Sequence, residues 1–153
     1  TTTAAADEST TTTAASDYDV FATATSLANV PDELPDGQYF GYITTLALAD
    51  DGAVGQFDLA ELLTGQAAAD AAEAAGEEPL DFFIKNDNAK LRPITVASDG
   101  TINDIDYGDC CDPKPTGYAD FVAARDAAGE GQTPVSIVVE DGTVTRIDEI
   151  YFP

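Results

Sequence analysis

The chain has 153 residues, of which 29 are acidic and 6 are basic, so its formal net charge is −23. A surface of this sign repels polyanions, which argues against nucleic acid and anionic membrane as partners. Histidine, methionine and tryptophan are absent, and with them the commonest general base and transition-metal ligand. No stretch of the roughly 18 apolar residues that a transmembrane helix needs occurs in the sequence.

The acidic excess also bears on the surroundings of the protein. Six basic residues can pair with only a fraction of the carboxylates, so the others repel one another unless salt or cations screen them. This composition is typical of halophile proteins, and acidic secreted proteins of other organisms share it. Both interpretations stay open, and both favour salty surroundings or a cell exterior with plentiful divalent cations.

The N-terminal segment has the composition of a disordered chain. Residues 1–17, TTTAAADESTTTTAASD, contain seven threonines and five alanines but no aromatic residue, so they cannot bury enough apolar surface to offset the loss of chain entropy. We predict a disordered, acidic Thr/Ala-rich stalk over residues 1–26 and a single α+β domain over residues 36–153. Residues 18–35 form a transition that we expect to dock on the domain. Stalks of this kind commonly separate a domain from an anchor, which favours an extracellular or cell-surface anchored protein.

The first half of the domain predicts a hairpin and a helix. In chain order we expect a strand over residues 38–48, a return strand over 54–59, a helical turn over 59–63 and a helix over 66–75. The turn sequence Asp51-Gly52 joins the two strands. Asp58 caps the helical turn, Thr64 is the N-cap of the Ala-rich helix, and Gly76 ends that helix.

The second half predicts further strands and a second helix. We expect strands over residues 81–85 and 91–97 joined by a turn at 86–90, a helix over 116–128 that ends at Gly129, and a final hairpin of strands over 135–140 and 143–152. Pro93 indicates that the strand over 91–97 lies at an edge or starts after this residue, because proline cannot donate to a ladder. Asp141-Gly142 is the residue choice of a type I′ turn.

Two Asp-Gly pairs begin a similar phrase, DGTINDID at 99–106 and DGTVTRID at 141–148. We interpret each as a turn followed by a strand. Together these elements predict an α+β fold: a mainly antiparallel sheet or partial barrel of about six strands, with two helices.

The aspartate-rich stretch that follows raises the question of a metal site. An EF-hand loop is rejected, because aligning Gly100 with its glycine puts Thr95 and Ala97 where ligands are needed. Ca²⁺ tolerates irregular oxygen cages, so a looser cation site stays open beside a solvated acidic loop. Its candidate ligands are Asp104, Asp106, Asp109 and Asp112.

Cys110 and Cys111 are adjacent. Zinc needs more ligands at spaced positions, and the chain has no third cysteine and no histidine. The surrounding carboxylates raise the thiol pKa, which argues against a reactive thiolate. A vicinal disulfide, or one buried and one exposed thiol, is the favoured interpretation.

Half of the basic residues fall within one stretch, KNDNAKLR at 85–92. A small anionic-ligand or partner site would use these cations with oriented polar groups between them. The alternative is a turn whose cations neutralise nearby acids and stabilise the fold. The candidate residues are Lys85, Asn86, Asp87, Asn88, Lys90 and Arg92.

Several phrases carry a family resemblance: FDLAELLTG at 57–65, NDNAKLR at 86–92 and the valine-rich closing hairpin at 135–153. They resemble a group of small secreted or lipid-anchored bacterial proteins, frequent in actinobacteria, that have no assigned function. The resemblance implies an extracytoplasmic module tethered through its N-terminal segment, with a lipid anchor upstream. It supplies no catalytic residues.

We therefore expect a non-enzymatic module, secreted or at the cell surface, that binds a protein or small-molecule partner. The first alternative is an extracellular hydrolase that uses paired carboxylates, for which 29 acidic residues offer too many pairs to select one. The second is a structural module stabilised by Ca²⁺.

Overall fold

A computed structural model describes residues 30–105, 112–128 and 133–152 of the chain. These residues form seven strands and two helices. In chain order they are β1 (Gly37–Ala49), β2 (Gly52–Thr64), α1 (Gly65–Ala75), β3 (Phe82–Lys85), β4 (Leu91–Ile105), β5 (Pro113–Pro115), α2 (Tyr118–Ala128), β6 (Val135–Glu140) and β7 (Thr143–Glu149).

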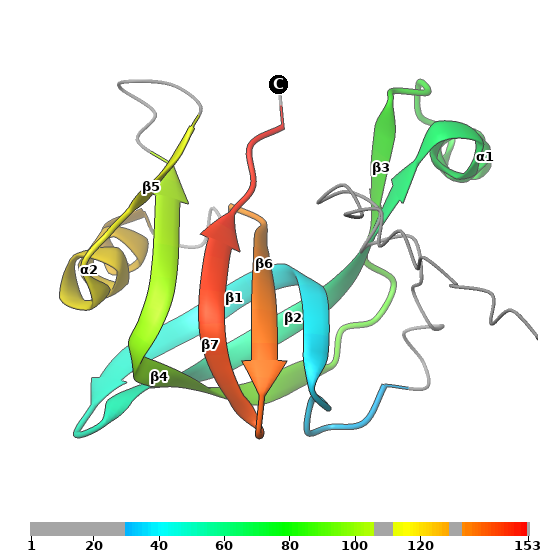
Figure 1. Cartoon of the computed structure of the whole chain (residues 1–153). Helices are drawn as coiled ribbons and strands as arrows, with labels where there is room; N and C mark the ends of the chain where they lie inside the picture. The colour runs from blue at the N-terminus through cyan, green and yellow to red at the C-terminus, as the bar shows by residue number, and fades with distance from the viewer. Residues whose placement is uncertain (1–29, 106–111, 129–132, 153) are drawn as a thin grey trace, which may run out of the picture.

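Five of the strands close into a barrel (Figure 1). β1 pairs antiparallel with β2 and β6, β2 pairs antiparallel with β4, and β6 pairs antiparallel with β7. The parallel pairing of β4 with β7 closes the ring, so its strand order is β1-β2-β4-β7-β6. The predicted α+β fold with a mainly antiparallel, barrel-like sheet is confirmed. Its order, its single parallel pair and a helix between the third and fourth barrel strands are the connectivity of the OB fold, a five-stranded Greek-key barrel.

The interior of the barrel is filled by apolar side chains. Alternate residues of each strand point inward, and Phe57, Ile137 and Ile147 are fully buried. Helix α2 adds Phe121 and Val122 to the same core. At full burial each such side chain contributes about 1.5–3 kcal/mol, so this core is the main source of stability.

Helix α2 attaches where β1 is irregular. The register of β1 against β2 shifts between Ile43 and Thr45, and the ladder of β1 with β6 ends at Gly41. Arg125 donates to the Ile43 carbonyl at 3.1 Å, and its guanidinium lies 5.3 Å from the centre of the Phe121 ring. These two contacts of Arg125 join the helix to β1.

β3 and α1 form an extension beyond the barrel (Figure 1). α1 begins after Thr64, as predicted, and ends at Gly76, whose φ of 75° is the left-handed conformation that glycine adopts easily. The predicted helical turn over residues 59–63 is wrong, because β2 continues to Thr64. Pairing with β3 decides this, since Leu62 lies opposite Ile84 in the ladder.

The two Asp-Gly phrases have different structures. Asp141 and Gly142 have φ of 50° and 74°, so the predicted hairpin turn is confirmed. The predicted turn at Asp99-Gly100 is wrong, because β4 is one strand from Leu91 to Ile105. Its first half pairs with β2 and its second half with β7, and a register shift between Val96 and Thr101 absorbs the change.

The remaining differences lie at strand ends. β5 was not predicted, and it pairs with residues 103–105 of β4. Pro93 lies in the half of β4 that has β2 on one side only, because pairing with β7 begins at Val96. The expected edge position of this proline is confirmed. Residues 30–36 dock on the domain, where Leu34 joins the core.

Gly41 tests the close approach of β1 and β2. A Cβ at this position would overlap the Asp58 carbonyl oxygen and lie 2.9 Å from the Phe57 ring. Gly41→Ala should lower the free energy of unfolding by about 2–4 kcal/mol, because the backbone has to move. Gly117→Ala is the control, since the nearest atom there is the movable Asp120 carboxylate at 3.2 Å. Equal losses in the two variants, measured by urea unfolding, would contradict the packing described here.

Candidate functional site

The outer surface of the barrel has two unlike faces. On one face, Asp148 of β7 accepts from Asn103 of β4 at 2.5 Å and pairs with Arg146 at 2.6 Å. Gln38 of β1 donates to Ser136 of β6 at 2.7 Å on the same side. The polar groups on this face, which we call the polar face, are thus already bonded to one another.

The opposite face, formed by β1, β2 and the first half of β4, carries one charged side chain among its described strand residues, that of Asp58, which lies opposite Leu91 in the ladder at the border of the face. Its strands are in register, with Ala47 opposite Val54 and Val54 opposite Thr95. Val54 is 50 % exposed and Leu91 is 47 % exposed, two of the few large apolar side chains left open to solvent among the described residues. We call this surface the neutral face. Its outward residues are Thr45, Ala47, Val54, Gln56, Leu91, Pro93 and Thr95.

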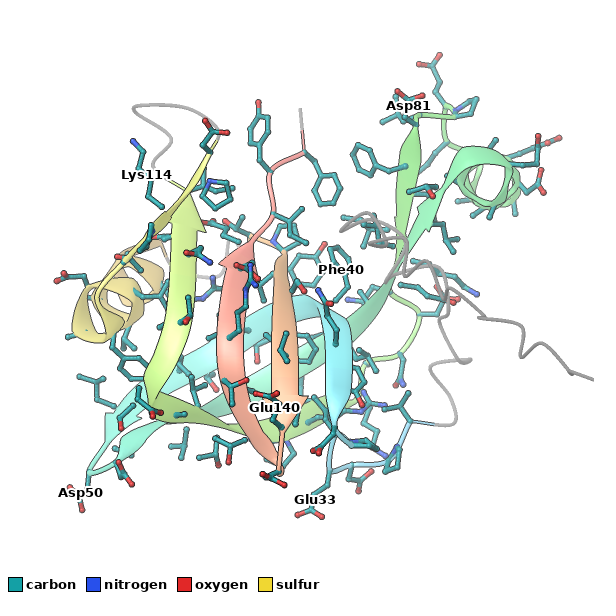
Figure 2. The ribbon with its side chains drawn as sticks, in the orientation of Figure 1. Glu33, Phe40, Asp50, Asp81, Lys114 and Glu140 are labelled. Carbon is teal, nitrogen blue, oxygen red and sulfur yellow. The ribbon has the colours of Figure 1, made fainter. Side chains whose placement is uncertain are left out.

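Along β1 and β2 the neutral face continues into an aromatic cluster that lies outside the barrel. The Phe152 ring lies edge-to-face against Phe40, with 6.2 Å between the ring centroids. It is tilted against the Phe82 ring, with 4.3 Å between the centroids. Figure 2 shows Phe40 near the middle of the molecule. Burial raises the pKa of Tyr42, and the nearby Asp58 carboxylate raises it further. The cluster comprises Phe40, Tyr42, Ala60, Leu62, Phe82, Ile84, Ile150 and Phe152.

The predicted polar stretch at 85–92 borders the neutral face. Asn86 donates to Asp58 Oδ2 at 2.9 Å, which links the turn to β2. Oδ1 of Asp58 is buried without a hydrogen-bond partner among the described residues. The Asn88 side chain accepts from the Lys90 amide at 3.0 Å, an Asx-type turn.

The cations of this stretch are already paired. Lys85 lies 3.4 Å from Asp87, and Lys90 pairs with Asp32. The pKa of Asp32 is lowered, mainly by the side-chain hydrogen bond that Lys90 donates to it and then by the charge of that lysine. Both pairs are exposed to solvent, so each contributes little to stability. Lys85 and Lys90 thus neutralise nearby acids, as the structural interpretation predicts.

Arg92 has a structural position that sequence reasoning could not assign. Its side chain is 1 % exposed and lies opposite Phe57 in the ladder, on the inward side of β4. It donates to the carbonyls of Pro31 at 3.0 Å and Val30 at 3.2 Å. Tyr39 donates to the Pro35 carbonyl at 2.7 Å. Residues 30–36, which we call the N-terminal strap, are therefore held to the barrel at both ends.

A pair of carboxyl groups that the sequence did not single out as a pair lies near helix α2. The Ile105 amide donates to Asp104 Oδ1 at 3.1 Å and to the buried Glu149 at 2.7 Å. Desolvation raises the pKa of Asp104 to about 6, with a hydrogen bond and charge repulsion from Glu149 adding to the effect, while the Arg125 charge opposes it. The two side chains come from the ends of β4 and β7, which the parallel pairing brings side by side.

The other predicted metal ligands are only partly visible. Asp112 lies just before β5 and is exposed, whereas Asp106, Asp109 and both cysteines lie outside the described residues. In the described part of the chain, no group of three or more acidic or cysteine side chains could hold a metal. The calcium site and the vicinal disulfide therefore stay predictions.

A pocket of about 570 Å³ lies between the N-terminal strap, the first half of β4 and the β6–β7 hairpin. It is separate from the Asp104–Glu149 pair, since neither residue lines it. Its volume is within the range of small-ligand pockets, about 300–1,000 Å³.

The chain matches no protein-family model, no curated protein and no solved structure. Among the helices that the structure describes, none has the length and apolar character to cross a membrane. Fold and surface alone define the class: an acidic α+β barrel with OB-fold connectivity and an outer face on which apolar and uncharged side chains predominate.

Replacing Arg92 tests how the strap is held. Arg92→Met should lower the free energy of unfolding by about 1–3 kcal/mol and speed amide exchange in residues 30–36, because the Val30 and Pro31 carbonyls lose their donor. Arg146→Met is the matched control, since its ion pair is 57 % exposed on the arginine side and should cost below about 1 kcal/mol. Unchanged exchange in the strap of Arg92→Met would contradict this role.

The Asp104–Glu149 pair predicts a pH dependence of stability. The pKa of Asp104 is about 6 in the folded protein and about 3.9 in an unfolded chain, so the folded state holds the extra proton between these values. The stability from this proton is present below about pH 4 and is lost as the pH rises through about 6. Asp104→Asn should therefore gain roughly 1 kcal/mol relative to wild type between pH 4 and pH 7, after allowance for solvent screening.

Urea unfolding at several pH values measures this difference. Asp120→Asn, on the exposed side of α2, is the control and should follow the wild-type pH profile. A constant offset between Asp104→Asn and wild type at all pH values would show that the pair does not share a proton.

Proposed function

We propose that the protein is a non-enzymatic, extracytoplasmic binding module, secreted or held at the cell surface, whose partner binds on the neutral face. The single observation that carries the proposal is an outer surface with open apolar side chains and one carboxylate, Asp58, at its border, on a chain of net charge −23. An exposed apolar surface with a polar rim is typical of an interaction site.

The filled barrel supports an external binding surface. Ile43, Phe57, Val96 and Ile137 are each at most 1 % exposed, so their packing leaves no room for a ligand at the centre of the barrel. In OB folds the outer face of the second and third barrel strands is the usual binding surface, and these strands correspond to β2 and β4. This analogy concerns the fold and adds support only for the location.

The charge of the chain restricts the partner. Nucleic acid fits poorly, because binding to a phosphate backbone depends on cations, and Lys85 and Lys90 at the border of the face are already paired. A protein surface with an apolar centre fits the neutral face.

The acidic composition supports the extracytoplasmic setting. Surface proteolysis of intact producing cells tests this location.

Paired-carboxylate hydrolysis is the second candidate, and the Asp104–Glu149 pair favours it, because a carboxyl group with a pKa of about 6 suits general acid catalysis. Binding is the better-supported function because both carboxyl groups accept from the Ile105 amide. The described pocket also lies elsewhere.

Site-specific photo-crosslinking tests the neutral face. A photoreactive phenylalanine analogue in place of Thr95 or Val54 should yield a discrete adduct in producing cells, because both positions face the partner. The same analogue at Thr101 is the matched control, since Thr101 is an exposed threonine of the same strand, paired with Arg146 on the polar face.

A charge substitution completes the test. Val54→Asp should reduce adduct formation at Thr95 at least tenfold, because a desolvated, unpaired carboxylate costs more than about 1.4 kcal/mol at an interface. Thr101→Asp should leave it unchanged. Equal adducts from Thr95 and Thr101, or no effect of Val54→Asp, would overturn the proposal.

A further inference from the structure

The pocket beneath the N-terminal strap exists because β4 and β7 separate. Their pairing begins at Val96 and Val144, so the first half of β4 leaves a gap beside the β6–β7 hairpin. The strap crosses this gap, held by Arg92 and Tyr39. In Figure 2 Glu33, on the strap, lies at the same end of the molecule as Glu140, where β6 ends.

The walls of the pocket are mainly apolar. Leu34 of the strap, Ile94 of β4 and Val144 of β7 line it together with Val139 of β6. These four side chains are at most 7 % exposed and belong to the barrel core. An apolar stem that enters the pocket would therefore leave water for a close-packed wall, which is favourable by about 25 cal/mol per Å².

Two carboxylates on the strap, those of Glu33 and Asp36, also line the pocket. The rest of the lining comprises Pro31, Pro35, Gly142, and Pro93 and Thr95, where the pocket borders the neutral face. Asp36 accepts from the Gly142 amide at 3.4 Å, and among the described residues no lysine or arginine pairs with either carboxylate. The nearest cations are engaged elsewhere, Lys90 with Asp32 and Arg92 with backbone carbonyls. The pocket thus offers negative charge beside apolar walls.

We propose that this pocket binds an organic cation, an ammonium or guanidinium group on an apolar stem. A metal ion is the poorer fit, because Ca²⁺ requires six to eight oxygen ligands and the pocket supplies two carboxylates. The stem would pack on the apolar lining, to which the exposed Pro31, Pro35 and Pro93 also belong, while the charged head faces Glu33 and Asp36. This proposal does not depend on the partner of the neutral face.

NMR titration of the full chain with hexylammonium chloride at constant ionic strength tests the proposal. We expect saturable shifts of the methyl signals of Leu34, Ile94, Val139 and Val144. Ammonium chloride, which has no stem, and 1-hexanol, which has no charge, should each bind at least fivefold more weakly. Equal effects of ammonium chloride, or shifts confined to other parts of the surface, would overturn the proposal.

Charge-removing variants locate the head group. Glu33→Gln should weaken hexylammonium binding about two- to fivefold, the range for a solvent-exposed ion pair, and Asp36→Asn should act in the same direction. Glu78→Gln removes the same charge from an exposed site after α1 and should change the affinity by less than about 1.5-fold. If Asp36→Asn disturbs the hairpin, the Glu33→Gln variant alone tests the head-group position. Equal weakening by Glu33→Gln and Glu78→Gln would indicate a general charge effect and would refute the site.

A last comparison distinguishes two sources of the cation. A blocked tripeptide with a central lysine presents the same ammonium group from a polypeptide. Tighter binding of this peptide than of hexylammonium would support a lysine side chain of a partner chain, and weaker or equal binding would support a free amine. Failure of both probes to bind would overturn the proposal.

Discussion

Strand β4 has to pair with two different neighbours, and the barrel depends on this. Its first half is antiparallel to β2 and its second half is parallel to β7. The two pairings meet at Val96, which is buried at the centre of the core. Because one continuous strand pairs with both neighbours, the sheet closes on itself, which leaves the first half of β4 as an edge and pairs its second half.

The same constraint creates the features at the end of the barrel. β4 reaches β7 only from Val96 onward, so its first half borders a gap that the strap covers. Arg92 holds the strap by donating to Val30 and Pro31. At the other end of β4, parallel pairing with β7 brings Asp104 beside Glu149. A buried cation, a pocket and a carboxyl pair all follow from the course of one strand.

The net charge of the chain makes the difference between the two outer faces informative. On a protein of net charge −23, carboxylates would be expected wherever the surface is free of other demands. The polar face pairs its acids internally, as Arg146 and Asp148 show. The neutral face carries apolar and uncharged residues instead and leaves Val54 open to solvent. Since the interior is filled, the binding surface that we propose lies on the outside of the barrel.

Much of the local structure could be predicted from the sequence. The helix over residues 66–75 was predicted from its alanines, Thr64 and Gly76, because capping depends on neighbours in the chain. The Asp141-Gly142 turn was predicted for the same reason. The phrase at Asp99-Gly100 has a similar composition but no turn, because β2 and β7 hold both halves of β4 in one strand. Residues 59–63 likewise extend β2, because β3 pairs with them.

The features of the candidate site also fall into those that the sequence predicts and those that depend on the fold. Composition and spacing are properties of the chain alone, so the sequence already shows that residues 85–92 concentrate half of the basic residues and that the chain is strongly acidic. The inward position of Arg92, which holds the strap, and the proximity of Asp104 to Glu149 follow from the tertiary structure. The shared outer face of Val54, Leu91 and Thr95 does so too. These relations depend on strand register and barrel closure, where energy comes from contacts between residues far apart in the sequence, which no local pattern encodes.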